Sequence, residues 1–147
     1  MTPREIGVFF NEEAKEMTDY DFIKRLLKMI DENNNFCVDI QLIKEKLARI
    51  YPDMDTDKFN NVFFKSLFLL KDCGAIEEMA GRNLGFRIDV LNNIQYTDCV
   101  IRLTSVGYNF YENMCKNGFM SKIKNISLVA AIEFSKAFIA KSVDTLL

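Results

Sequence analysis

Three amphipathic helical patterns follow one another between residues 19 and 73, and this succession restricts the fold of the chain more than any other feature. Apolar residues recur at helical spacing in each pattern, and a residue that can cap a helix precedes each one, namely Thr18, Asp39 and Asp55. The patterns predict helices over about residues 19–33, 40–51 and 56–73. Because each helix has one apolar stripe, we expect the three helices to share a single small core.

The pattern changes after Gly74, which is placed to end the third of these helices. Residues 75–80 and 86–90 flank a glycine-rich turn, and this arrangement predicts a β-hairpin. Short extended pieces are predicted at residues 36–38 and 100–103. The order helix, short strand, helix, helix, hairpin is typical of a winged helix. We therefore predict a mainly helical α+β chain with a winged helix-turn-helix-like domain.

Further helices are predicted on both sides of this domain. Residues 3–16 carry a capping box and a helical apolar pattern. Thr104 can cap a helix to about residue 117, and a last helix begins near Ser121 or Ser127. We divide the chain into an N-terminal helical extension (1–17), the winged-helix-like domain (18–103) and a C-terminal helical segment (104–147).

The composition excludes most kinds of catalysis. The chain of 147 residues is 49% hydrophobic and 27% charged, which fits one folded domain, and it contains no histidine. Without histidine, Ser–His and Cys–His catalysis and most metal sites are excluded. The glycine-rich segment 81–85 does not match a phosphate-binding loop. We expect a protein that is not an enzyme and has no cofactor and no metal.

Cysteine usage and hydropathy favour a cytoplasmic protein. The four cysteines form no CxxC pair, and their apolar neighbours predict buried, reduced thiols. The first residues lack the apolar core of a signal peptide. The most apolar stretch, residues 126–143, includes Glu133, Lys136 and Lys141, so we expect no membrane span.

Two segments resemble a known group of proteins. Residues 69–76 (LLKDCGAI) run from a helix end into a strand, and residues 102–110 (RLTSVGYNF) match an R-L-T-x-x-G-x-x-F/L pattern. Together they resemble uncharacterised phage- and prophage-associated winged-helix families of the YjcQ type, over about residues 19–125. The resemblance implies a winged-helix fold, a mobile-element or bacterial origin and DNA binding. It implies no catalytic residue.

If DNA is bound, the helix at 56–73 is the candidate recognition helix. Asn can read adenine, and Lys can contact guanine or phosphate. The candidate contacts lie on this helix, on the hairpin and on the lysine-rich linker after residue 115: Thr56, Lys58, Asn60, Asn61, Lys65, Arg82, Asn83, Arg87, Lys122 and Lys124. The alternative interpretation is that these are ordinary solvated side chains.

The charge of this region is balanced. Residues 56–90 contain five basic and five acidic side chains, and the whole chain has a net charge of −2. A strong DNA binder makes roughly 6–10 phosphate contacts, so one copy of this surface is expected to bind weakly.

The last helix has apolar residues on more than one side, and this pattern predicts a homodimer. The N-terminal helix is expected to share the interface, whose candidate residues are Phe9, Phe10, Ile132, Phe134, Phe138, Ile139 and Val143. The alternative is a last helix that folds wholly into its own core.

Two functional hypotheses follow. The first is a dimeric, phage- or prophage-type regulatory protein that binds DNA. The second is a protein-interaction module that binds a host or defence protein, which the low basicity and the many phenylalanines favour.

Overall fold

The computed structural model describes residues 19–32, 38–79, 85–88, 91, 94–97 and 100–146. Six helices lie in this part of the chain: α2 (Tyr20–Asp31), α3 (Ile40–Ile50), α4 (Thr56–Asp72), α5 (Ser105–Met114), α6 (Phe119–Ile123) and α7 (Leu128–Leu146). The strands described are β1 (Val38–Asp39), β2 (Ile76–Glu78), β3 (Gly85–Ile88), β4 (Ile94–Thr97) and β5 (Val100–Leu103). The predicted α+β class, mainly helical with little strand, is confirmed. The helix predicted at 3–16 lies outside the described residues.

The helix starts follow from capping side chains. Asp39 and Asp55 cap α3 and α4 as predicted, and Thr104 caps α5 by accepting a hydrogen bond from the Gly107 amide. The cap of α2 is Asp19 rather than the predicted Thr18, because the Asp19 carboxylate accepts hydrogen bonds from the amides two and three residues on.

A small antiparallel sheet has the strand order β1–β5–β2. Val38 lies opposite Ile101, and Ile76 lies opposite Leu103. Val38, Ile76 and Ile101 are buried, so the sheet closes one side of the core with its central strand.

The predicted hairpin between residues 75–80 and 86–90 is wrong. β2 pairs with β5, whereas β3 pairs with β4, so that Phe86 lies opposite Tyr96. β4 lies in the stretch 92–98, which the sequence analysis placed between strands. β2 has only three residues, and pairing with β5 brings its buried Ile76 alongside Leu103, which also packs on the core.

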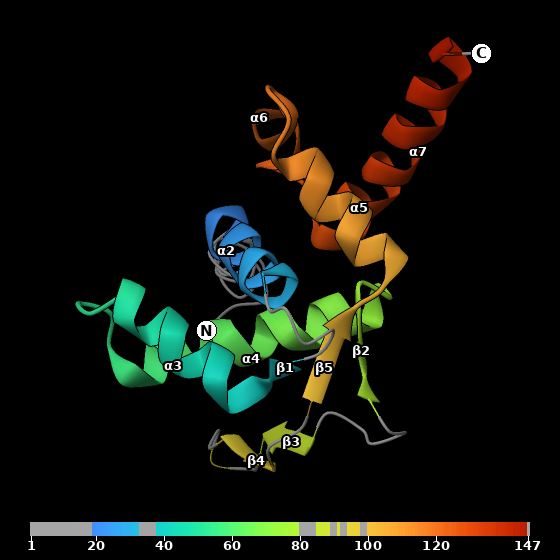
Figure 1. Cartoon of the computed structure of the whole chain (residues 1–147). Coiled ribbons are helices and arrows are strands. Elements are labelled where there is room, and N and C mark those ends of the chain that lie inside the picture. The colour runs from blue at the N-terminus through green and yellow to red at the C-terminus, as the bar shows by residue number, and fades with distance from the viewer. Residues whose placement is uncertain are drawn as a thin grey trace, which may run out of the picture.

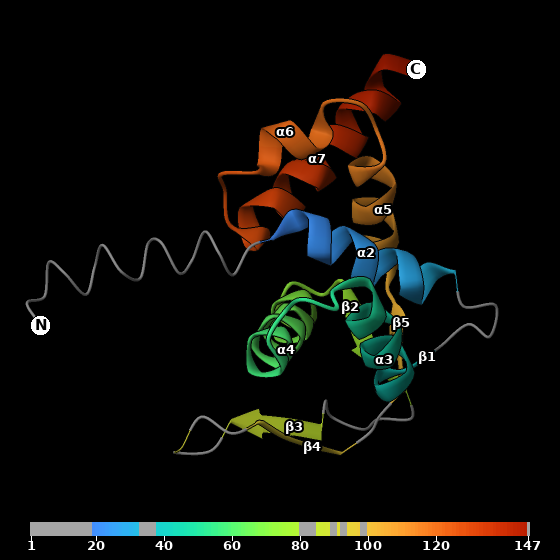
Figure 2. The ribbon, with the colours of Figure 1, turned by 90° about the vertical axis from the view of Figure 1, so that its left-hand side faces the viewer.

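Helix α2 forms a middle layer. In Figures 1 and 2, α3 and α4 lie on one side of α2 and α5–α7 on the other. On the α4 side, the Phe22 ring meets Phe59 edge-on at 6.0 Å, and Phe63 meets Phe64 at 5.2 Å. On the α5–α7 side, Phe119 of α6 packs against rings of α5 and α7. Two groups of aromatic rings therefore fill the two sides of the core.

The second group belongs to α5, α6 and α7. The Phe119 ring lies 6.2 Å from that of Phe110 and 5.5 Å from that of Phe134. Short α6 was not predicted as a separate helix; it begins after Gly118, whose φ of 84° is left-handed. The predicted helix to about residue 117 ends earlier, at Met114. The last helix begins after Ser127, whose hydroxyl accepts a hydrogen bond from the Ala130 amide.

A close joint connects α5 to the end of α4. Gly74, at a φ of 76°, ends α4 as predicted. The Thr104 hydroxyl donates a hydrogen bond to the Gly74 carbonyl. The Thr104 backbone amide donates another to the Ala75 carbonyl at 3.0 Å. A Cβ on Gly107 would lie 2.0 Å from that same Ala75 oxygen. The L-T-x-x-G pattern at residues 103–107 therefore has a structural role in this joint.

Two buried polar contacts attach α7 and the turn before it. The Tyr20 hydroxyl donates to the Ile126 carbonyl at 2.6 Å, and burial raises the pKa of this hydroxyl above its ordinary value. The Asn113 side-chain amide donates to the Ser135 hydroxyl at 2.7 Å. The first contact joins α2 to the turn before α7, and the second joins α5 to α7. Within the described part, no helix has the length and the apolar character needed to cross a bilayer.

Candidate nucleic-acid interface

The first turns of α4 carry polar side chains on two sides of the helix. Thr56 and Asn60 line the groove toward α3, whereas Lys58, Asn61 and Lys65 lie on the other side. Thr56, Lys58 and Asn61 are exposed, while Asn60 and Lys65 are half-buried. This division arises because α4 turns a row of apolar residues inward, including Phe59 and others 0–5% exposed. The structure therefore brings the five candidates on this helix to one segment, residues 56–65.

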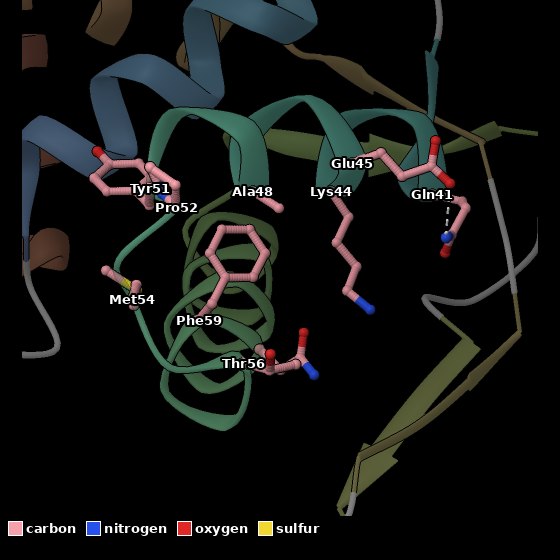
Figure 3. A pocket seen from close by; sticks show the side chains of 10 residues that line it. Gln41, Lys44, Glu45, Ala48, Tyr51, Pro52, Met54, Thr56 and Phe59 are labelled. Carbon is pink, nitrogen blue, oxygen red and sulfur yellow. Dashed lines mark hydrogen bonds between the residues drawn. The ribbon is translucent and has the colours of Figure 1, made fainter.

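A groove of about 300 Å³ separates α4 from α3. Figure 3 shows the Phe59 ring turned toward Ala48, and the Lys44 side chain extending along the groove. Gln41 donates a hydrogen bond to Glu45 at 3.2 Å on the α3 side. The Asn60 side-chain oxygen is buried and has no hydrogen-bond partner among the described residues. A side chain that enters this groove would therefore meet an apolar floor with polar edges.

The β3–β4 hairpin lies on the same side of the molecule as α3 and α4. In Figures 1 and 2 it is on the far side of these helices from α5–α7. Arg87 belongs to β3, opposite Gln95 of β4. Arg82 and Asn83 lie outside the described residues. One candidate of the predicted wing is thus placed on a strand of a hairpin on the α4 side.

The charge of the α3–α4 face is only slightly positive. Residues 40–65 contain five basic and four acidic side chains, which gives a net charge of +1. Lys71, near the end of α4, forms an ion pair with Glu78, and Arg102 on β5 forms one with Glu77. The acidic residues at the start of α4 stabilise the helix through its positive N-terminal end, and they repel phosphate.

Sequence analysis missed the basic residues of α3. Lys46 and Arg49 are exposed, and Lys44 is half-buried beside the groove, with its ammonium 5.6 Å from the centre of the Phe64 ring. All three lie between the inward positions of this helix, such as Ile43 and Leu47. The same helical spacing that identified the apolar stripe could have identified them.

Lys122 and Lys124 do not join this face. Both are exposed at the end of α6, and α6 lies beyond α2 from α4 and the hairpin (Figures 1 and 2). The structure thus separates these two lysines from the candidates on α4. A straight duplex that contacts α4 does not also reach them.

The candidate dimer residues have different surroundings. Ile132 is only 2% exposed within its own chain, so its side chain is not available to a second copy. Phe134 is half-buried and packs on Phe119, and Phe138 packs on the same ring. Ile139 and Val143 belong to α7, and Phe9 and Phe10 lie outside the described residues.

The two described cysteines are free thiols. Burial is the main cause that raises the pKa of the half-buried Cys73 thiol. The prediction of a buried thiol is wrong for Cys115, which is exposed because it forms the C-cap at the end of α5. Cys37 and Cys99 lie outside the described residues. In the described ranges, no three potential ligands among Cys, Asp and Glu side chains gather at a point where they could hold a metal ion.

In comparisons with known proteins, the chain matches no protein-family model, no curated protein and no solved structure. The resemblance to YjcQ-type families stays a prediction.

Proposed function

We propose that α2–α4 and the β1–β5–β2 sheet form a winged-helix-type domain, and that the protein is a non-enzymatic regulatory protein that binds DNA through α4. The order helix, strand, helix, helix, strand, then a returning strand, supports this assignment. Along the chain, the β3–β4 hairpin comes between β2 and β5, which is the position of a wing.

One observation carries the proposal: the α4 face is left open. The C-terminal helices pack on the opposite side of α2, so that none of α5, α6 and α7 covers the first turns of α4 or the hairpin (Figures 1 and 2). Lys58 and Asn61 are exposed on the outer side of α4, and Thr56 is exposed at the edge of the groove toward α3. A helix of 17 residues is about 25 Å long and fits the major groove.

The residue types assign different roles within this face. The Asn61 side-chain amide can form two hydrogen bonds with the edge of an adenine. Asn60 can do the same only if its side chain turns outward, because its oxygen is buried. Lys58 and Lys65 contact phosphate or guanine. Because the net charge of residues 40–65 is only +1, the contribution of the DNA backbone is small, and binding depends on base contacts.

A binding titration tests the proposal. We expect the protein to bind a duplex selected from a random pool, with an affinity that falls between about 50 and 200 mM salt. Lys58→Ala should weaken binding to all sequences and reduce the salt slope by about 1. Asn61→Ala should cost roughly 1–3 kcal/mol for the selected site and less for other sequences.

Lys124→Ala is the matched control, because this exposed lysine lies across α2 from α4 and should not alter binding. If no duplex is enriched from the pool at 50 mM salt, DNA binding by this protein is refuted. Light scattering on the same samples tests the predicted homodimer.

A second candidate function is a protein-interaction module. The groove between α3 and α4 favours it, because Phe59, Ala48 and Met54 line a hollow of about 300 Å³ that suits an apolar side chain of a partner. Loss of protein capture on Ala48→Glu, together with absence of DNA enrichment, would favour this function over the first.

A further inference from the structure

The surface around the α6–α7 turn combines exposed basic side chains with apolar ones, of which Val129 and Ala130 are exposed and Ile126 is half-buried against the core. We name it the α6–α7 patch: Lys122, Lys124, Ile126, Val129 and Ala130. Val129 is 58% exposed, more than any other large apolar helical side chain whose exposure the structure describes. Residues 113–132 contain three lysines and no acidic residue. The patch is therefore suited to an acidic, amphipathic partner.

The chain itself carries such a segment, and it begins beside the patch. Residues 1–18 contain four glutamates against one lysine and one arginine, a net charge of −2. Residue 18 precedes the cap of α2, and the Tyr20 hydroxyl lies 2.6 Å from the Ile126 carbonyl. The segment therefore joins the body at the turn that bears the patch.

The helix predicted for residues 3–16 needs a surface to pack on. At 100° per residue, Ile6, Phe9, Phe10 and Ala14 fall on one face of it together with Glu13, and Glu12 and Glu16 fall along one edge of that face. An isolated helix of this length is marginally stable in water. Only two residues separate it from Asp19, so the effective concentration of the patch near this helix is high.

We propose that residues 3–16 form a helix that packs its apolar face on Ile126, Val129 and Ala130 of the same chain, with its glutamates facing Lys122 and Lys124. This intramolecular docking is independent of DNA binding by α4. It assigns the two lysines to contact with the chain's own N-terminal segment, in place of the predicted contact with nucleic acid.

Methyl and amide NMR on the full chain tests the proposal. Phe9→Ser with Phe10→Ser should shift the methyl resonances of Ile126 and Val129 and speed amide exchange in residues 3–16 by about tenfold or more. Val8→Ser is the matched control, because Val8 falls on the opposite face of the predicted helix and its loss should change neither signal. The methyls of Ile43 and Leu67, in the buried core, report whether the fold is retained.

Reversal of the charges on the patch and on the N-terminal segment gives a second test. Lys122→Glu with Lys124→Glu should speed the same amide exchange, and adding Glu12→Lys with Glu16→Lys should slow it again. Unchanged Ile126 and Val129 resonances in the Phe9/Phe10 variant would refute the docking. The docking within one chain is also refuted if the effects appear only at concentrations where light scattering gives a dimer mass, because the occupant is then a second copy.

Discussion

The two sides of α2 bury similar aromatic side chains but are assembled differently. On the α3–α4 side, rings from α2 and α4 and aliphatic side chains of α3 fill the core, and the outer face stays polar. On the α5–α7 side, single contacts fix the helices: Gly107 on Ala75, Asn113 on Ser135 and Tyr20 on Ile126. One side therefore depends on a repeated apolar pattern between long helices, and the other adds single close and polar contacts between shorter elements.

The largest expected loss of stability comes from removing a buried ring, and it should differ between the two aromatic groups. Phe63→Ala should lower the free energy of unfolding by about 3–5 kcal/mol, because Phe63 is completely buried between long helices that cannot close the cavity. Phe119→Ala should cost less, since α6 has only five residues and can move into the space. Chemical denaturation measures both, and equal losses would contradict the comparison.

The joint at Gly107 should be the most sensitive single contact on the α5–α7 side. Gly107→Ala places a Cβ against the Ala75 carbonyl and should cost about 2–3 kcal/mol of unfolding free energy. Ser105→Ala, at an exposed position of the same helix, is the control and should be nearly neutral. A Gly107→Ala protein as stable as the control would show that α5 shifts freely on the sheet.

The same comparison shows how much of the fold was predictable. Periodicity placed α2, α3 and α4 to within two residues, because each apolar stripe repeats several times along its helix. Strands of two to four residues offer too few repeats, so the pairing of β2 with β5 was missed. The Thr104–Gly107 pattern was visible, but its reason, the carbonyl of Ala75, exists only in the folded chain.

The candidate site was predictable to the same degree. The exposure of Lys58 and Asn61 followed from their positions between inward residues of α4. The separation of Lys124 from these residues depends on the placement of α6 on the far side of α2 from α4, and no local pattern encodes that arrangement.

Loss of the buried amide contact should have an intermediate effect. Asn113→Ala leaves the Ser135 hydroxyl buried without its partner and should cost about 1–3 kcal/mol of unfolding free energy. Asn117→Ala, at an exposed position in the same connection, serves as control. If both variants unfold at the same denaturant concentration, the contact does not stabilise α7.

The smallest expected effect at neutral pH is that of Tyr20→Phe, about 1 kcal/mol for one hydrogen bond. Burial raises the pKa of this hydroxyl in the folded state, so the folded protein keeps its proton more firmly than the unfolded chain. Stability should therefore fall as pH rises above about 10, the ordinary value for tyrosine.

The Tyr20→Phe protein should lose less stability than the wild type over this alkaline range. Some loss should remain, because the pKa of Tyr51 and Tyr111 is also raised by burial, that of Tyr111 to about 12. Denaturation curves at pH 7, 9 and 10.5 measure the difference. Parallel losses in the two proteins would contradict the assignment to Tyr20.

The central position of β5 affects how the protein is made. Both neighbours of this strand precede it in the chain, β1 at Val38–Asp39 and β2 at Ile76–Glu78. During synthesis, both strands are made before residues 100–103, and their pairing has to wait until β5 follows them. Their lengths of two and three residues limit the effect of this delay, because such short edges are poor templates for pairing with neighbouring nascent chains.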